Sequence, residues 1–480
     1  METNVESGER KNREAFKSGV WYTISNVIIR SVSILTAPIF TRILTTSDYG
    51  KASNFTAWMS LFAIFTGLCL SYSFGRANID FKEQFNEYVL SMQTLSSGFA
   101  LLIFIFAVLL SKQLAILMNM EQFLVIILFL YLLIVPSVDY MQTKYRFCFK
   151  YKENITITYI NTIGVVGFSL IFIFIFNEQR YLGRIIGIIL PMFLIGIVFY
   201  VKIFIEGKRI NLTYWSYALK ISIPMIPHAL AIVVLTQIDR IMITKFSGSS
   251  ALGIYSFGYS YAILLSIFTN SIAQAWIPWL YNEYHSGRYE LIKKANKIIN
   301  IGMGMLTILF VSIAPEVLKL LGTEAFWEAK WVVAPIAIGA FFQYLYSNYS
   351  SIELYHKKTI PIAVGTILAA GINYILNYMF IPKYGYVAAA YTTCISYLFL
   401  VLFHWINCKK IIKEKIYDDA FILKIIVVTV IITIGVVKLY DAILIRYLFL
   451  VVCIVMMSFI YKSEVKTAVI KLKQQFSSKK

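Results

Sequence analysis

The sequence alternates apolar runs of about 20 residues with short clusters of Lys and Arg. A helix of that length is about 30 Å long, which matches the hydrocarbon core of a bilayer. Hydrophobic residues make up 59% of the chain and charged residues 14%, whereas soluble domains carry about 25% charged residues. Because a water-soluble core could not bury so much apolar surface, we expect an all-α integral membrane protein with about 14 transmembrane helices.

The predicted spans follow the apolar runs along the whole chain. They lie at 17–40, 50–72, 88–110, 114–138, 154–176, 182–204, 218–244, 251–281, 298–321, 331–352, 359–381, 384–408, 421–440 and 443–461. The first run follows a polar tail that contains Arg10, Lys11 and Arg13, and it lacks a cleavage signature of small residues. We therefore interpret it as a retained helix and not as a signal peptide.

Basic residues gather in alternate loops. They occupy the N-terminal tail, the loops after the fourth, sixth, eighth, tenth and twelfth spans, and the C-terminal tail. Since short cytoplasmic loops retain an excess of Lys and Arg, both termini are expected in the cytoplasm. The net charge of +19 is spread over these loops, so we expect anionic membrane lipids and not nucleic acid as the partner of the basic side chains.

The sequence offers no pattern typical of an enzyme. The five Cys and four His residues are dispersed, without the spacing of a zinc site, a disulfide framework or a catalytic triad. The loops are short, and a membrane glycosyltransferase or polymerase, the enzyme alternative, would carry a large extracytoplasmic loop with catalytic residues. We therefore expect neither catalysis nor a metal or cofactor.

An internal repeat divides the chain. The junction TRILTTSDYGKAS contains Gly50, and TKFSGSSALGIYS contains Gly253, which follows it by 203 residues; Gly385 follows Gly183 by 202. This period predicts two pseudo-symmetric six-helix lobes with the same polarity and a substrate path between them. The expected segments are an N-terminal tail at 1–16, the N-lobe at 17–205, a cytoplasmic linker at 206–216, the C-lobe at 217–408, a helix pair at 409–462 and a basic tail at 463–480.

Polar side chains recur on one face of several spans. Such stripes must face something other than lipid, which is either a neighbouring helix or a shared water-filled cavity. Several aligned stripes favour the cavity. The amide side chains that we expect to line it are Asn26, Asn270, Gln274, Asn373 and Asn377.

Three charges lie deep within predicted spans, where insertion costs about 2.5–3.5 kcal/mol each. Arg30 shares its span with no acidic residue, and its guanidinium suits phosphate oxygens, so it is the first candidate for a contact to an anionic head group. Arg240 is the second candidate. Asp239 either orients Arg240 or couples transport to a proton or sodium gradient, and a structural ion pair with a neighbouring helix is the alternative for both.

Three stretches carry a family resemblance: TTSDYGKAS, TQIDRIMITKFSGSSALGIYSFGYS and IPKYGYVAAAYTTCISYL. In their order and spacing the chain resembles the Wzx-type flippases of O-antigen or capsular repeat units, in the polysaccharide transport branch of the multidrug/oligosaccharidyl-lipid/polysaccharide superfamily. The resemblance covers essentially the whole chain. It implies a bacterial inner-membrane protein that turns undecaprenyl-pyrophosphate-linked oligosaccharide from the cytoplasmic to the periplasmic leaflet, through a cationic cavity between two lobes.

The main hypothesis is therefore a lipid-linked oligosaccharide flippase that works by alternating access, with the polysaccharide polymerase machinery as a further partner. A lipid II flippase and a multidrug exporter of the same superfamily remain the alternatives. An exporter of cationic drugs would need buried carboxylates, whereas the deep positions here hold more Arg than Asp.

Overall fold

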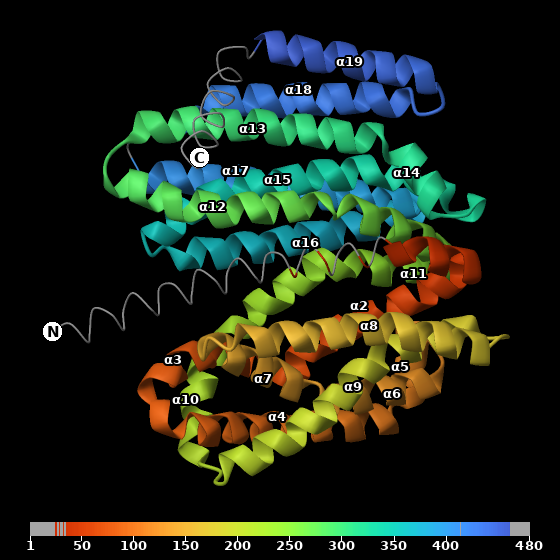
Figure 1. Ribbon diagram of the computed structural model, residues 1–480, viewed down its shortest axis with the longest axis vertical. Coiled ribbons are helices and arrows are strands. Elements are labelled where there is room, and N and C mark those ends of the chain that lie inside the picture. Colours follow the sequence, from red (N-terminus) through yellow and green to blue (C-terminus); the bar gives the residue numbers. More distant parts are fainter. Residues whose placement is uncertain (1–24, 26–27, 29–31, 33–34, 413, 461–480) are drawn as a thin grey trace, which may run out of the picture. The chain divides into compact units, whose positions relative to one another are not determined.

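The computed structural model describes residues 25, 28, 32, 35–412 and 414–460, and the regular elements in that part of the chain are all helices (Figure 1). The all-α architecture is therefore confirmed. The chain forms two compact units: unit 1 comprises Met1–Ser256 and Ile381–Gly385, and unit 2 comprises Phe257–Phe380 and Tyr386–Lys480. The lobe, linker and tail boundaries expected from the repeat stay predictions.

The helices have the length and composition of membrane spans. Among the described residues, ten helical runs meet both criteria, or eleven if the bent pair Thr46–Gly67 and Leu70–Asp80 forms one span. One of the ten, Leu212–His285, has 74 residues and would exceed 100 Å if straight, which is too long for one crossing. Each predicted span from 50–72 onward overlaps at least one helix, and the first falls largely outside the described residues.

Unit 1 begins with a helical segment at 35–43. Its further elements are α2 (Thr46–Gly67), η1 (Leu70–Ser73), α3 (Phe74–Asp80), η2 (Lys82–Gln84), α4 (Phe85–Leu109), α5 (Ser111–Met118), α6 (Gln122–Ile134), α7 (Pro136–Phe147), α8 (Tyr151–Ile175), α9 (Arg180–Gly207), α10 (Leu212–Ser222), η3 (Ile223–Met225) and most of α11 (Ile226–Ala262). Buried aromatic rings, among them those of Phe74, Tyr88 and Tyr140, pack at one end of the unit.

Local signals in the sequence explain where helices begin and end. Thr45 and Asp48 form a capping box that starts α2, and α2 ends at Gly67 because Leu68 adopts a left-handed conformation (φ 49°). The predicted span 50–72 therefore contains the bend between Gly67 and Leu70. The predicted span 114–138 starts too early, since Asn119 (φ 50°) ends α5, whereas α6 and α7 lie in one helical run, Gln122–Phe147, that continues past Pro136.

Helices α8 and α9 pack along their lengths because α9 presents glycines to α8. A Cβ at Gly183 would overlap the backbone of Phe172 and Ile173, and a Cβ at Gly187 would overlap Ser169. Small residues allow this close backbone approach, which is how helices associate in a membrane without a hydrophobic driving force. The two helices therefore form a closely packed pair within unit 1.

Unit 2 holds the end of α11 and the remaining helices, of which α13, α18 and α19 lie side by side (Figure 1). Its elements are α12 (Leu265–His285), α13 (Tyr289–Ser312), α14 (Ala314–Leu321), η4 (Glu324–Ala329), α15 (Lys330–Tyr355), most of α16 (Thr359–Tyr384), α17 (Tyr386–Ile411), α18 (Asp419–Lys438) and α19 (Ile443–Ile460). Helix α15 is the central one: most of its side chains are buried, and it packs closely on α17, with Gly339 facing Cys394.

Candidate functional site

Two of the eight predicted cavity residues, Asn26 and Arg30, lie outside the described residues. Their role stays a prediction. The other six lie on α11, α12 and α16, and the structure shows different surroundings for each pair.

Asp239 and Arg240 lie on α11, before the point at which this helix breaks. Gly248 has φ 85° and ψ 172°, a backbone conformation that is accessible essentially only to glycine. Asp239 is 1% exposed and accepts a 2.7 Å hydrogen bond from the Tyr255 hydroxyl, which lies beyond the break. The half-buried Arg240 donates from Nη1 to the Thr236 carbonyl at 2.7 Å. A buried carboxylate therefore joins the two halves of the broken helix.

Asn373 and Asn377 are fully buried between α16 and α17. Asn377 donates to Asn373 Oδ1 at 3.1 Å, Asn373 donates to Thr393 Oγ1 at 3.2 Å, and Thr392 donates to Asn377 Oδ1. These hydrogen bonds include two between neighbouring helices, which is the alternative to a cavity lining that we gave for these polar side chains.

Asn270 and Gln274 are exposed on α12, one turn apart. Exposed amides are unfavourable against lipid, so this face of α12 favours water or a polar ligand over hydrocarbon. Within unit 2 these two side chains fit the predicted cavity better than Asn373 and Asn377 do.

The two repeat motifs meet inside unit 1, where the start of α2 crosses the part of α11 that follows Gly248. A Cβ at Gly50 would lie 1.8 Å from the Ser249 carbonyl oxygen, and a Cβ at Gly253 would lie 1.9 Å from the Thr46 carbonyl oxygen. Ser249 follows Thr46 by the same 203 residues that separate the glycines, so the contact is reciprocal. We call these four residues the glycine crossing. A reciprocal contact is what a twofold pseudo-symmetry between the motifs produces.

A hydrogen bond and a small charged pocket accompany the glycine crossing. The Thr46 and Ser250 hydroxyls share a 2.6 Å hydrogen bond. Beside them, a pocket of about 340 Å³ contains Lys51 and Glu121, whose charged atoms are 3.8 Å apart. The Tyr181 hydroxyl donates to the same Glu121 carboxylate at 2.7 Å.

Sequence reasoning missed Arg184 on α9. Its guanidinium lies 3.9 Å from the centre of the Phe40 ring and donates to Ser169 Oγ at 2.9 Å. A stacked arginine with several further N–H groups suits an anionic ligand. The signal was present, because Arg184 lies inside the predicted span 182–204.

Sequence reasoning also missed Glu353 and His404, which form a fully buried pair in unit 2. Glu353 lies one residue beyond the predicted span 331–352, so it counted as a loop residue. Within the described part of the chain, no group of three or more His, Cys, Asp or Glu side chains is arranged to hold a metal ion.

A family model and membrane-protein relatives match parts of this chain. A family model described as polysaccharide biosynthesis protein matches residues 15–282. An uncharacterized membrane protein of Methanocaldococcus jannaschii is 23% identical over 56% of this chain and 55% of its own length. An uncharacterized membrane protein of Haemophilus influenzae is 24% identical over 72% of this chain and 86% of its own length. The match thus spans about half of the archaeal relative.

Solved structures of transporters share the fold. The lipid II flippase MurJ in an inward closed conformation aligns with a TM-score of 0.69 over 93% of this chain and 100% of that one, at 15% identity. An inward-facing multidrug resistance MATE family transporter of the MOP superfamily aligns with a TM-score of 0.61 over 81% and 98%, at 13% identity. At these identities the likeness concerns the fold alone.

Proposed function

Because this chain belongs to the polysaccharide biosynthesis protein family, we propose that it is a flippase for lipid-linked oligosaccharides. It would move undecaprenyl-pyrophosphate-linked repeat units from the cytoplasmic to the periplasmic leaflet of a bacterial inner membrane, in the manner of Wzx-type proteins. The products would be O-antigen, capsule or exopolysaccharide, made together with the polysaccharide polymerase machinery. Both chain termini would lie in the cytoplasm.

The chemistry of such a substrate explains why a protein is needed. Each sugar hydroxyl that enters hydrocarbon without a hydrogen bond costs several kcal/mol, so the sugars need a polar path while the polyprenyl tail stays in lipid. The pyrophosphate needs cations. Arg30 and Arg240 are the proposed head-group contacts, with Asp239 as the partner that orients Arg240, and Arg184 joins them on the evidence of its geometry.

The glycine crossing is the observation that supports the proposal of alternating access. It is a close backbone contact between the two repeat motifs, at the loops that the charge pattern assigns to the periplasmic side. Its hydroxyl–hydroxyl bond between Thr46 and Ser250 can be exchanged for bonds to water at little cost when the motifs separate. We propose that the crossing closes the periplasmic side in this conformation and separates to release the substrate.

A translocation assay tests the proposal directly. Proteoliposomes with the full chain should move a fluorescent polyprenyl-pyrophosphate oligosaccharide between leaflets faster than protein-free vesicles. Arg30→Ala should abolish most of this movement at unchanged protein levels, whereas Arg42→Ala should not, because Arg42 is an exposed arginine whose Nη1 donates to its own helix. Equal rates for the two variants would remove Arg30 from the site.

Lipid II transport is the second candidate, since the lipid II flippase MurJ shares the fold over nearly the whole chain. The same vesicles discriminate between the candidates. Movement of lipid II, without movement of repeat-unit lipids, would replace the proposal. Movement of a cationic dye alone would favour a multidrug exporter.

A further inference from the structure

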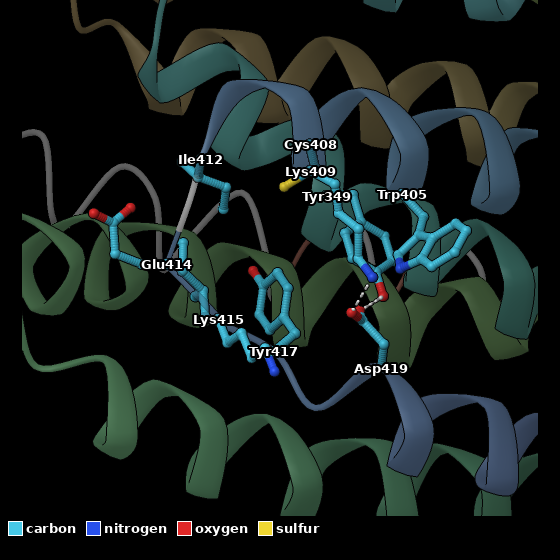
Figure 2. A pocket seen from close by; sticks show the side chains of 10 residues that line it. Tyr349, Trp405, Cys408, Lys409, Ile412, Glu414, Lys415, Tyr417 and Asp419 are labelled. Carbon is cyan, nitrogen blue, oxygen red and sulfur yellow. Dashed lines mark hydrogen bonds and ion pairs between the residues drawn. The ribbon is translucent and has the colours of Figure 1, made fainter.

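Glu353 on α15 and His404 on α17 form a buried ionisable pair in unit 2. His404 Nδ1 lies 2.9 Å from Glu353 Oε2, and both residues have 0% relative exposure. We infer that this pair is a proton-binding site of the transport cycle, reached through the adjacent pocket shown in Figure 2. The role in the cycle rests on the proposed function, whereas the proton-binding itself does not.

The other polar atom of each side chain has no hydrogen-bond partner. Glu353 Oε1 and His404 Nε2 are both buried and unpaired. On the Nε2 side, α16 approaches so closely that a Cβ at Gly365 would lie 3.2 Å from this nitrogen. The Tyr346 ring stacks on the imidazole with 5.6 Å between ring centres. The pair is thus buried, with two further positions that could hold a proton.

Charge balance limits what the pair can hold. With one proton on the imidazole beyond its neutral form, or with that proton on the carboxylate, the pair has no net charge. Removing the proton leaves one net negative charge and adding another leaves one net positive charge, and both are costly where water is excluded. The buried pair is therefore least costly with one proton, and water that reaches it would lower the cost of releasing that proton.

The pocket supplies a route for water and protons. It has a volume of about 360 Å³, and its lining includes Tyr349, Cys408 and Asp419. Tyr349 precedes Glu353 by one turn of α15, and Cys408 follows His404 by one turn of α17, so one helical turn separates the pocket from the pair. Figure 2 shows Tyr349 and Lys409 converging on Asp419, which accepts from them at 3.3 and 2.9 Å.

The other ionisable groups around the pair have partners of their own. Helix α12 presents Tyr281, which donates to the Ser351 carbonyl, and Tyr284, which bonds to His356; α13 presents Lys297, which pairs with Asp418. Helix α17 adds Cys408, within electrostatic reach of both Glu353 and Asp419, and α16 faces the imidazole with Gly365. These hydrogen bonds and ion pairs leave Glu353 and His404 to balance each other's charge.

Most of the residues that line the pocket lie between Lys409 and Asp419, a segment that the charge pattern assigns to the cytoplasmic side. A conformation that admits water to the pair would release its proton to that side, and the pair would take a proton up again from the same side. Proton binding would thus differ between conformations, so the transport rate would depend on cytoplasmic pH.

Nitrogen NMR of the histidine side chains tests the inference. The chain has four His residues, and His404→Gln identifies one resonance in the full chain, reconstituted in nanodiscs. We expect Glu353→Gln to lower the ratio of protonated to neutral His404, because it removes the negative charge that lies 2.9 Å from the imidazole. Glu178→Gln, which removes an exposed carboxylate of unit 1 outside this pocket, is the matched control and should leave the ratio unchanged. In transport assays, His404→Gln should remove the response of the rate to the pH on the pocket's side of the membrane.

The outcomes separate the inference from the proposed function. Equal His404 protonation in the wild type and Glu353→Gln would overturn the inference, and so would a response to the pH on the pocket's side that survives His404→Gln. Neither result touches flippase activity. If the NMR result holds but no lipid-linked oligosaccharide moves, the proposed function fails while the proton site stands. If Glu353→Gln does not accumulate, Glu353→Asp, which shortens the carboxylate, should lower the same ratio by a smaller factor, and an unchanged ratio would overturn the inference.

Discussion

Adding one methyl group at the glycine crossing should open it. In Gly50→Ala the new Cβ would lie 1.8 Å from the Ser249 carbonyl oxygen, whereas real Cβ atoms essentially never come within 3.0 Å of such an atom. The two segments must therefore move apart by about 1.2 Å or more, and overpacking of this kind costs about 1–3 kcal/mol. The ratio of closed to open crossing should fall by about 5- to 150-fold.

A cross-link reports the closed crossing directly. Thr46→Cys with Ser250→Cys places two thiols where the hydroxyls are 2.6 Å apart, and mass spectrometry distinguishes this disulfide from those of the five native Cys residues. Gly98→Ala is the matched control, because a Cβ there meets nothing within 4 Å. Both substitutions gain the helical preference of Ala, about 0.5–1 kcal/mol, so only the clash differs between them.

The expected result is slower cross-linking in Gly50→Ala than in Gly98→Ala, at equal protein levels. Gly253→Ala should act alike, and the double substitution should cost less than the sum, because the first methyl already separates the segments. Equal cross-linking rates in Gly50→Ala and Gly98→Ala would refute the reasoning. Additive costs would show that the two glycines do not share one contact.

Two further predictions concern stability. Asn377→Ala removes one hydrogen-bond partner from the buried Thr392 hydroxyl and one from the Asn373 amide, so the free energy of unfolding should fall by about 1–3 kcal/mol. Asn270→Ala should leave the melting midpoint unchanged and slow transport. Equal midpoints for the two variants would contradict this prediction. The Lys297 ammonium beside Asp418 holds the pKa of that carboxyl below its usual value. The contribution of this ion pair to folding stability is present above the unfolded pKa of about 3.9 and is lost as pH falls through the folded pKa. Asp418→Asn, which keeps the N-cap, should therefore be less stable than the native chain at pH 7 and equally stable at strongly acidic pH.

Apolar runs were enough to predict the helical membrane class, because a span needs only length and hydrophobicity. The breaks were harder to predict. Asn119 ends α5 through its left-handed backbone conformation, which average hydropathy does not register. The repeat period predicted that Gly50 and Gly253 are equivalent. It did not predict that each glycine makes room for a carbonyl group of the other motif.

The candidate site depended on contacts between distant segments. The i, i+4 spacing of Asn373 and Asn377 predicted a shared face, yet whether that face meets water or Thr392 and Thr393 depends on where α17 packs. Glu353 was missed because it lies one residue beyond the predicted end of the span 331–352, whereas the helix continues to Tyr355. Its burial depends on His404, which is 51 residues away in sequence.

The break in α11 ties the deepest described acid of unit 1 to the glycine crossing. Tyr255 lies two residues after Gly253 on the same helical segment, and its hydroxyl donates to Asp239 across the break at Gly248. When that segment swings away from α2, the phenol travels with it and the carboxylate loses a donor. The exit on one face of the bilayer and the hydrogen bonding of a carboxylate in its interior would then change in a single motion.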